Sequence, residues 1–301
     1  MDFRKLESFV SIVKHGSFTR AAEELYLTQP TITGHIQSLE NRLGTVLLNR
    51  NGKTVSLTEA GQILYNHALN ILSTREHALL SLAQYEGRLE GNLAIASSTV
   101  PQRSILPSLL AAFRQKYPQI TFAIKQFDSR GVIDAIVSGA MDFGFVGRDP
   151  SMPDLEVNEL CQARLMVIAP CRGNFQSTDG TTIAWNQVKN EPFILREEGS
   201  ASRTLFLHSL EGKGIDPGEL RVAATIENPD TIKQCVMAGL GVAVVSERSV
   251  EDEIRLGLLK GFYISGFDLV QSFYFINHRR RVLSPIAAAF KEFTAEYFQV
   301  P

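Results

Sequence analysis

The chain has 301 residues, of which 44% are hydrophobic and 21% are charged, and its formal net charge is −2. This length and composition fit a globular protein with one small and one or two medium-sized domains, and they exclude a disordered or collagen-like chain. Residues 1–60 hold 7 Lys and Arg against 6 Asp and Glu, a balance of 7 − 6 = +1. Charge alone therefore does not indicate nucleic-acid binding, and a solvated mixed-charge domain remains an alternative.

No run of the chain reaches the roughly 18 apolar residues of a membrane-spanning helix. The N-terminal residues follow an amphipathic helical pattern with charged positions, which differs from a signal peptide. We therefore expect a cytoplasmic protein without a membrane partner. The three cysteines are odd in number and form no Cys-x-x-Cys pair, so neither a disulfide framework nor a zinc ribbon is expected.

Two helices joined by a turn are predicted within the first 44 residues. Ser17 is a good N-cap for the first, and Thr28 is one for the second, which Gly44 ends. The apolar positions of the second helix recur at helical spacing and predict its inward face: Ile32, Ile36, Leu39 and Leu43. Its opposite face is short, uncharged and rich in hydrogen-bonding groups, which suits a helix against base edges in a major groove.

A basic hairpin is predicted to follow this helix. Asn51-Gly52 is a hairpin turn signal, and Arg50 and Lys53 place two cations beside it. His35 on the second helix is a candidate for a phosphate contact, with an ordinary surface histidine as the alternative. The candidate DNA-binding residues are Gln29, Pro30, Thr31, Thr33, His35, Arg50 and Lys53.

A long helix is predicted from residue 59 to residue 86, a length of roughly 40 Å at 1.5 Å per residue. Its apolar positions keep the alternating four- and three-residue spacing of a two-helix contact, interrupted by Arg75. We interpret it as a dimerisation helix because a helix of this length has little else to pack against. The candidate dimerisation residues are Leu64, Ala68, Ile71, Ala78 and Leu82.

Beyond residue 90 the pattern changes to strands that alternate with helices, which is typical of an α/β domain. The strands fall into two sets, each of which we expect to form its own sheet. The predicted strands are 93–96, 121–127 and 143–146, then 165–169, 193–195, 222–226 and 242–245, with 272–277 expected to return to the first set.

Hydroxyl-rich helix starts follow two of these strands and predict a site for a small anion. Free N–H groups at a helix start favour anions, and ligands bind at the carboxyl ends of strands in open α/β sheets. The alternative is that Ser200 only caps a helix and that Arg203 forms a surface salt bridge. The candidate effector-binding residues are Ser97, Ser98, Thr99, Gln102, Ser200, Ser202 and Arg203.

Other chemistry has weak support in the sequence. Gly239-Leu240-Gly241 precedes a strand, whereas a dinucleotide-binding glycine motif follows one and opens a helix. The six histidines have no ligand spacing, and no nucleophile, metalloprotease or phosphate-loop motif is present. We therefore expect no enzyme activity, no cofactor and no metal site.

Residues 1–61 resemble the winged helix-turn-helix of the LysR-type transcriptional regulators. The family pattern is paired Ala, a Leu, Ser/Thr-Gln-Pro, Leu-Glu, Leu-Gly, an Arg and Leu-Thr-x-Ala-Gly. Here it is met by Ala21, Ala22, Leu25, Thr28, Gln29, Pro30, Thr31, Thr33, Ile36, Leu39, Glu40, Leu43, Gly44, Leu47, Arg50, Leu57, Thr58, Ala60 and Gly61. The family often has Phe where this chain has Leu48. It often has a long polar residue where this chain has Gly34, so one possible base contact is absent here.

The resemblance implies an α/β protein with an all-α N-terminal part, which comprises a winged helix-turn-helix and a long linker helix. A two-lobed effector domain of the type II periplasmic-binding-protein kind follows. The implied boundaries are 1–58 for the DNA-binding domain, 59–88 for the linker and 89–301 for the effector domain. Lobe I would comprise 91–163 and 267–301, and lobe II 164–266, with chain crossings near 162–164 and 264–268.

The run Arg196-Glu197-Glu198-Gly199-Ser200-Ala201-Ser202-Arg203 also resembles a stretch of the LysR-type group that includes CysL-like and CbbR-like regulators. Several members of that group respond to small anions. The resemblance implies a regulator that binds double-stranded promoter DNA as a dimer, assembles into a tetramer, contacts RNA polymerase and responds to a small anionic metabolite. A solute-binding protein is the alternative, but it accounts only for residues 91–301.

Overall fold

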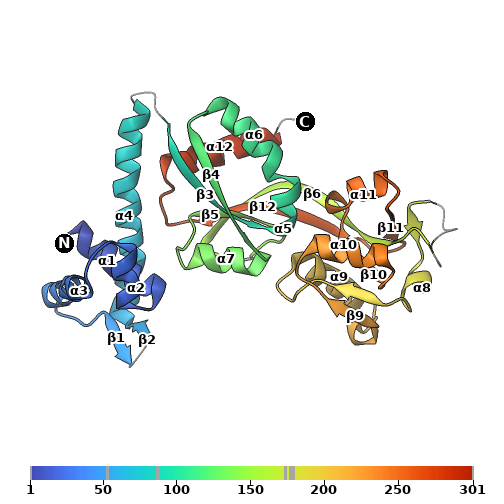
Figure 1. Cartoon of the computed structure of the whole chain (residues 1–301), viewed down its shortest axis with the longest axis horizontal. Coiled ribbons are helices and arrows are strands. Elements are labelled where there is room, and N and C mark those ends of the chain that lie inside the picture. The colour runs from blue at the N-terminus through green and yellow to red at the C-terminus, as the bar shows by residue number, and fades with distance from the viewer. Residues whose placement is uncertain (1, 52–53, 86–88, 173–174, 176–179, 300–301) are drawn as a thin grey trace. The chain divides into compact units, whose positions relative to one another are not determined.

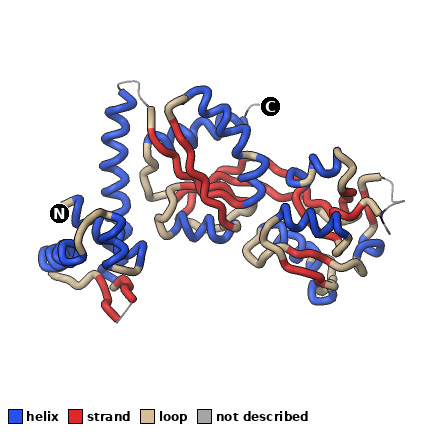
Figure 2. The backbone as a smooth tube through the Cα atoms, viewed as in Figure 1, coloured by secondary structure: helices blue, strands red, loops and turns tan. Residues whose placement is uncertain are grey.

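The computed structural model describes residues 2–51, 54–85, 89–172, 175 and 180–299. They form two compact units, Met1–Glu90 with Arg279–Ala289, and Gly91–His278 with Phe290–Pro301 (Figures 1 and 2). Within the first unit, the Ser73 hydroxyl of the long helix donates a hydrogen bond to the Val282 carbonyl. The segment 279–289, which we assigned to the effector domain, thus packs with the linker helix.

The first unit is a three-helix domain with a two-stranded wing and the long helix. Its elements are α1 (Phe3–His15), α2 (Phe18–Glu24), α3 (Gln29–Leu43), β1 (Leu48–Asn51), β2 (Thr54–Leu57) and α4 (Glu59–Tyr85). The predicted caps are present, since Ser17 accepts the Arg20 N–H and Thr28 accepts the Thr31 N–H, both at 3.3 Å. The predicted inward positions Ile32, Ile36 and Leu39 are buried, whereas Leu43 is exposed.

Three polar or small residues of the family pattern hold the wing against α3 and α4. Glu40 accepts the Leu47 N–H at 2.8 Å. Thr58 donates to the Val46 carbonyl at 2.7 Å and accepts the Gly61 N–H at 2.9 Å, which caps α4. A Cβ at Gly61 would lie 2.0 Å from the Leu47 carbonyl oxygen, so only glycine fits this close approach. The Leu-Thr-x-Ala-Gly pattern is therefore the joint between wing and linker.

Glu24 at the end of α2 ties this helix to α1. Hydrogen bonds from Lys14 at 2.6 Å and from Ser11 at 2.5 Å lower the pKa of Glu24 to about 2, despite the partial burial of its carboxylate. A carboxylate with a depressed folded-state pKa stabilises the fold above its unfolded pKa, and that stability is lost as the pH falls.

We expect Glu24→Gln to lose less unfolding free energy than the native chain when the pH falls from 6 to 2.5. In the native chain, the contribution of Glu24 declines as the pH falls from its ordinary pKa of 4.5 to about 2. Urea unfolding of the native and variant chains from pH 6 to pH 2.5 measures this difference. Glu23→Gln, at the exposed neighbouring residue, is the matched control. The same loss of unfolding free energy at low pH in all three proteins would contradict a stabilising role for the Glu24 carboxylate.

The N-terminal half of α4 packs on its own domain, and this revises the basis of the predicted dimer seam. Ala68 is completely buried, and Leu64 and Ile71 pack partly buried against the same core as α1 and α3. Arg75, which interrupts the predicted seam, forms a 3.0 Å ion pair with Glu7 of α1. Our premise that the helix has little else to pack against therefore fails for Leu64, Ala68 and Ile71, which contact their own domain.

The C-terminal half of α4 keeps exposed apolar side chains. Ala78 is exposed, and Leu79 and Leu82 retain 58% and 66% of their accessible surface. Leu79 was not among the predicted seam residues. Of the predicted seam, Ala78 and Leu82 are thus the positions whose side chains remain exposed for a partner helix.

The second unit alternates strands and helices and consists of two lobes. We define lobe I as β3 (Gly91–Ser98), α5 (Thr99–Ser104), α6 (Leu106–Lys116), β4 (Ile120–Phe127), α7 (Ser129–Val137), β5 (Phe143–Val146), the first part of β6 (Leu155–Pro170), β12 (Val270–His278) and the end of α12 (Pro285–Gln299). Lobe II holds the end of β6, β7 (Thr182–Ile183), α8 (Trp185–Val188), β8 (Phe193–Leu195), α9 (Ala201–Glu211), β9 (Val222–Thr225), α10 (Pro229–Ala238), β10 (Val242–Ser246), α11 (Glu251–Arg255) and β11 (Leu259–Ile264).

The strands of both lobes are hydrogen-bonded into one continuous path, whereas the sequence predicted two separate sheets. The order is β4-β3-β5-β12-β6-β10-β8-β9, and β11 pairs with β6 and β7. The 16-residue strand β6 makes this connection, because residues 155–164 pair with β12 and residues 165–170 pair with β10 and β11. One lobe crossing therefore runs inside β6, and the other lies between β11 and β12.

Aromatic side chains fill the centre of each lobe. In lobe I, Phe113 of α6 contacts Phe290 of α12 edge-on, with ring centroids 4.9 Å apart. In lobe II, Phe193 of β8 stacks on Phe206 of α9 at 5.8 Å. These contacts hold α6 against α12 in lobe I and α9 against β8 in lobe II.

Candidate functional site

The outward face of α3 presents the predicted base-reading residues. Gln29, Pro30 and Thr31 are exposed in its first turn, and Thr33 is half-buried with its hydroxyl donating to the Gln29 carbonyl at 2.9 Å. Gly34 is exposed, and a Cβ there would meet no described atom within 4 Å. The face therefore has no side chain at this position, and Gln29 in the first turn carries a long polar side chain.

The remaining predicted DNA contacts, His35, Arg50 and Lys53, are described to different extents. His35 is half-buried, and its Nδ1 lies 2.7 Å from the Ser8 hydroxyl of α1, so only its Nε2 is available for a phosphate. The backbone of Arg50 pairs with Val55 across the wing. The Arg50 side chain and the whole of Lys53 lie outside the described residues.

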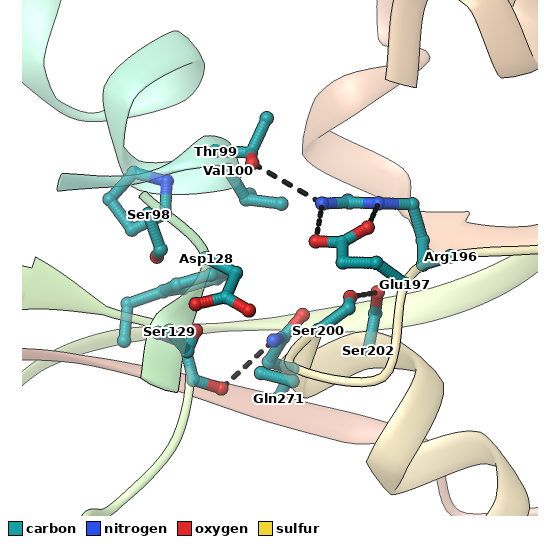
Figure 3. A pocket seen from close by; sticks show the side chains of 14 residues that line it. Ser98, Thr99, Val100, Asp128, Ser129, Arg196, Glu197, Ser200, Ser202 and Gln271 are labelled. Atoms are coloured by element: carbon teal, nitrogen blue, oxygen red, sulfur yellow. Dashed lines mark hydrogen bonds and ion pairs between the residues drawn. The ribbon is translucent and has the colours of Figure 1, made fainter. Parts of the chain in front are cut away.

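A small, polar pocket lies in the cleft between the lobes. Figure 3 shows side chains from lobe I on one side of it and from the loop before α9 on the other. Its polar lining residues are Ser98, Thr99, Asp128, Ser129, Arg196, Glu197, Ser200, Ser202 and Gln271. Four of the seven predicted effector residues, Ser98, Thr99, Ser200 and Ser202, therefore meet in one pocket.

Arg196 is the cation of this pocket, and it was not among the predicted effector-binding residues. It follows β8 directly, its side chain is 7% exposed, and its Nη2 donates to the Thr99 hydroxyl across the cleft at 3.3 Å. A buried guanidinium needs an anionic partner, which Glu197 provides. The signal available in the sequence was the position of Arg196 at the end of a strand, three residues before the glycine that precedes the α9 N-cap.

The start of α9 adds further donors to the pocket. Ser200 is the N-cap residue, yet within the described part of the chain its hydroxyl meets the Ser202 hydroxyl at 3.0 Å instead of capping the helix. Both serines are buried. The first N–H groups of this 11-residue helix are thus left for another acceptor.

Asp128 of lobe I closes the pocket against the α9 loop. Its carboxylate caps α7 by accepting the Gly131 N–H at 2.6 Å. A Cβ at Gly199 would lie 1.6 Å from Asp128 Oδ2, so any other residue there would force the Asp128 carboxylate to move. The glycine of the Arg-Glu-x-Gly-Ser stretch therefore allows this carboxylate of lobe I to lie against the α9 loop.

The other three predicted effector residues do not line the pocket. Ser97 is completely buried, and its hydroxyl donates to the Ser98 carbonyl at 3.0 Å. Arg203 donates to the Arg196 carbonyl at 2.8 Å, so it supports the loop instead of facing the cleft. Gln102 is half-buried on α5 and is absent from the pocket lining. The predicted guanidinium of the site is thus replaced by Arg196.

Gln271 of β12 offers the pocket an acceptor. Its Nε2 donates to the Gly147 carbonyl at 2.8 Å, which fixes the orientation of the amide, and the side chain is buried. Its Oε1 has no hydrogen-bond partner among the described residues. Nothing in the sequence around Gln271 distinguishes it from a sheet residue.

An ion cluster joins the lobes beside the pocket. Arg103 of α5 pairs with Asp230 of α10 and, at 3.5 Å, with Glu253 of α11. Lys233, with a side chain only 4% exposed, contacts both carboxylates, at 2.8 and 2.6 Å. The hydrogen bond from Lys233, together with that from Arg103, lowers the pKa of Asp230. Charges from both lobes thus hold α5 against α10 and α11.

The described residues contain no group of three or more His, Cys, Asp or Glu side chains arranged to hold a metal ion. None of the described helices is long and apolar enough to cross a membrane.

Family models match nearly the whole chain. Residues 3–62 match the bacterial regulatory helix-turn-helix protein of the lysR family, and residues 86–299 match the LysR substrate binding domain. The chain is 31% identical to the HTH-type transcriptional activator CmpR of Synechocystis, over 96% of this chain and 93% of that protein. It is 30% identical to the RuBisCO operon transcriptional regulator of Allochromatium vinosum, over 97% and 95% of the two chains.

A solved structure resembles the second unit. The Synechocystis CcmR regulatory domain, in complex with 2-PG, is 25% identical to this chain, with a TM-score of 0.63 over 70% of this chain and 99% of that one. The predicted resemblance to LysR-type and CbbR-like regulators is confirmed, and the solute-binding alternative is not favoured because it leaves residues 3–62 without a role. The chain belongs to the LysR family of transcriptional regulators, with a helix-turn-helix for DNA and a domain for an effector.

Proposed function

We propose that this regulator is controlled by a small anionic metabolite that binds in the pocket between the lobes, against Arg196. The observation that carries the proposal is a 7% exposed guanidinium at a pocket whose other donors are hydroxyls from both lobes and the start of α9. Hydroxyls, helix N–H groups and a guanidinium all favour a carboxylate or phosphate over an apolar ligand. The complex of the CcmR regulatory domain with 2-PG supports a small metabolite in this type of domain.

The acceptors of the pocket restrict the rest of the ligand. Among the described residues, Gln271 Oε1 is buried without a hydrogen-bond partner, and the Asp128 carboxylate also lines the pocket. A ligand hydroxyl would satisfy Gln271 Oε1, because an unpaired buried acceptor is costly. A second hydroxyl could donate to Asp128, whose Oδ1 already accepts the Gly131 N–H. A small hydroxylated carboxylate or phosphate therefore fits better than a bare oxyanion.

On the DNA side, we propose that α3 reads base edges through Gln29, Pro30, Thr31 and Thr33, and that Arg50, Lys53 and His35 contact phosphates. We also propose that α4 pairs two chains through Ala78, Leu79 and Leu82, and that two dimers join into a tetramer. Bending of promoter DNA by this tetramer would place it against RNA polymerase. As a chromosomal DNA-binding protein, the regulator would act in the cytoplasm.

Two substitutions test the effector site. Thr99→Ala and Ser200→Ala should leave binding to promoter DNA unchanged and weaken the thermal shift and the change in DNA binding caused by anions from a metabolite screen. The exposed Ser265, as Ser265→Ala, is the matched control. Full retention of the anion response in both pocket variants would contradict the site.

A further inference from the structure

We infer that Glu197 is an internal substitute for the anionic group of the effector, so that an effector binds Arg196 by displacing the Glu197 carboxylate. The inference rests on the proposed anion site and adds the event that the effector must bring about there. It assigns a regulatory role to a residue whose side chain forms a salt bridge with its sequence neighbour.

The geometry of the pair is that of a bound ligand. Arg196 Nε lies 2.8 Å from Glu197 Oε2, and Arg196 Nη2 lies 2.7 Å from Glu197 Oε1. These two parallel hydrogen bonds form the fork that guanidinium makes with a carboxylate or a phosphate. An effector anion would use the same two nitrogens, so it and Glu197 exclude each other.

Burial makes an occupant of this fork necessary. Arg196 is 7% exposed, and a buried cation without a counter-ion is strongly destabilising. Its other neighbour, the Thr99 hydroxyl, is neutral. Glu197 therefore stabilises Arg196 when no effector is bound. An effector has to bind Arg196 more strongly than this carboxylate does.

Glu197 also has space to move into. Its side chain is 17% exposed and also lines a second, larger pocket that shares Thr99 and Asp128 with the first. That pocket is lined by three other carboxylates, those of Asp128, Glu198 and Glu227. Like charges disfavour the displaced position of Glu197, which returns it to Arg196 when the effector leaves.

The test compares Glu197→Gln with Glu198→Gln in the full-length chain. Both substitutions remove one negative charge from the larger pocket, but only the first removes the competitor of the anion. Inorganic phosphate and glycolate serve as probes, and isothermal titration measures their dissociation constants. We expect Glu197→Gln to tighten binding of at least one probe about tenfold and Glu198→Gln to change it less than twofold. Adding Arg196→Lys to Glu197→Gln should abolish the gain.

Thermal unfolding provides a second readout and a folding control. Without a probe, Glu197→Gln should unfold at a lower temperature than the native chain because Arg196 loses its counter-ion. Phosphate should recover that loss, and it should stabilise the variant more than it stabilises the native chain. Glu197→Ala should behave in the same way, so the result does not depend on the residual polarity of glutamine.

Two outcomes overturn the inference, and they can be told apart. Probe binding to the native chain that depends on Arg196 but is not tightened by Glu197→Gln relative to Glu198→Gln overturns the substitute role alone. Binding of neither probe to the native chain nor to Glu197→Gln contradicts both this role and the proposed anion site.

Discussion

Leu82→Asp should separate the dimer and abolish high-affinity binding to an operator with two half-sites. Leu82 retains 66% of its surface in a part of α4 where the chain's own DNA-binding domain offers no cover, and Leu79 and Ala78 lie beside it. A charge buried between two helices costs several kcal/mol unless it is paired. The loss of the second half-site removes an avidity gain of roughly 100-fold or more.

Analytical ultracentrifugation and titration of a two-half-site fragment measure these two effects. Asn66→Asp introduces the same charge on the far side of α4, where Asn66 is exposed, and should leave both the mass and the affinity unchanged. An unchanged dimer in Leu82→Asp would move the pairing surface away from the C-terminal half of α4. The earlier candidate Ile71 is a poorer test, because Ile71→Asp would also disturb the core of its own domain.

Gln29→Ala should weaken binding to the specific operator by roughly 1 to 3 kcal/mol, or about 5- to 150-fold, and leave binding to random DNA nearly intact. Gln29 is exposed in the first turn of α3, and its amide can both donate to and accept from a base edge. Its contact with the Thr19 hydroxyl is long, at 3.4 Å, so the side chain is readily released to DNA.

Competition of labelled operator with unlabelled random duplex separates the two kinds of binding. Arg50→Ala is the contrasting variant. Loss of a wing cation from a phosphate should weaken binding to all DNA sequences and should lower the magnitude of the slope of log affinity against log salt concentration by about one unit. Equal loss of specific and random binding in Gln29→Ala would exclude a base-reading role for this residue.

The elements with local signals were predictable from the sequence. Capping residues placed α2 and α3 correctly, since Ser17 and Thr28 form the expected hydrogen bonds, and the four residues of β5 were predicted at their observed bounds. The first half of β6 and the whole of β11 were missed. Their pairing with β12 and with the end of β6 depends on partners more than 80 residues away, which no local pattern encodes.

The pocket shows the same division between local and distant information. Ser98, Thr99, Ser200 and Ser202 could be selected because hydroxyls at helix starts are a local pattern. Arg196 and Arg203 have similar positions around the same loop, and only the fold decides that Arg196 faces the cleft while Arg203 binds the backbone behind it. Gln271 comes from a strand contributed by the return of the chain to lobe I, so its place in the pocket required the topology.

Footprinting on a mapped promoter, with and without the anion that gives the largest thermal shift, shows whether the anion controls DNA binding through Arg196. We expect the anion to change the length or spacing of the protected region for the native chain, and we expect Arg196→Lys to bind the same promoter without that change. Lysine keeps the charge but cannot form the two parallel hydrogen bonds of the guanidinium. An anion-induced change of equal size in Arg196→Lys would contradict control through this pocket.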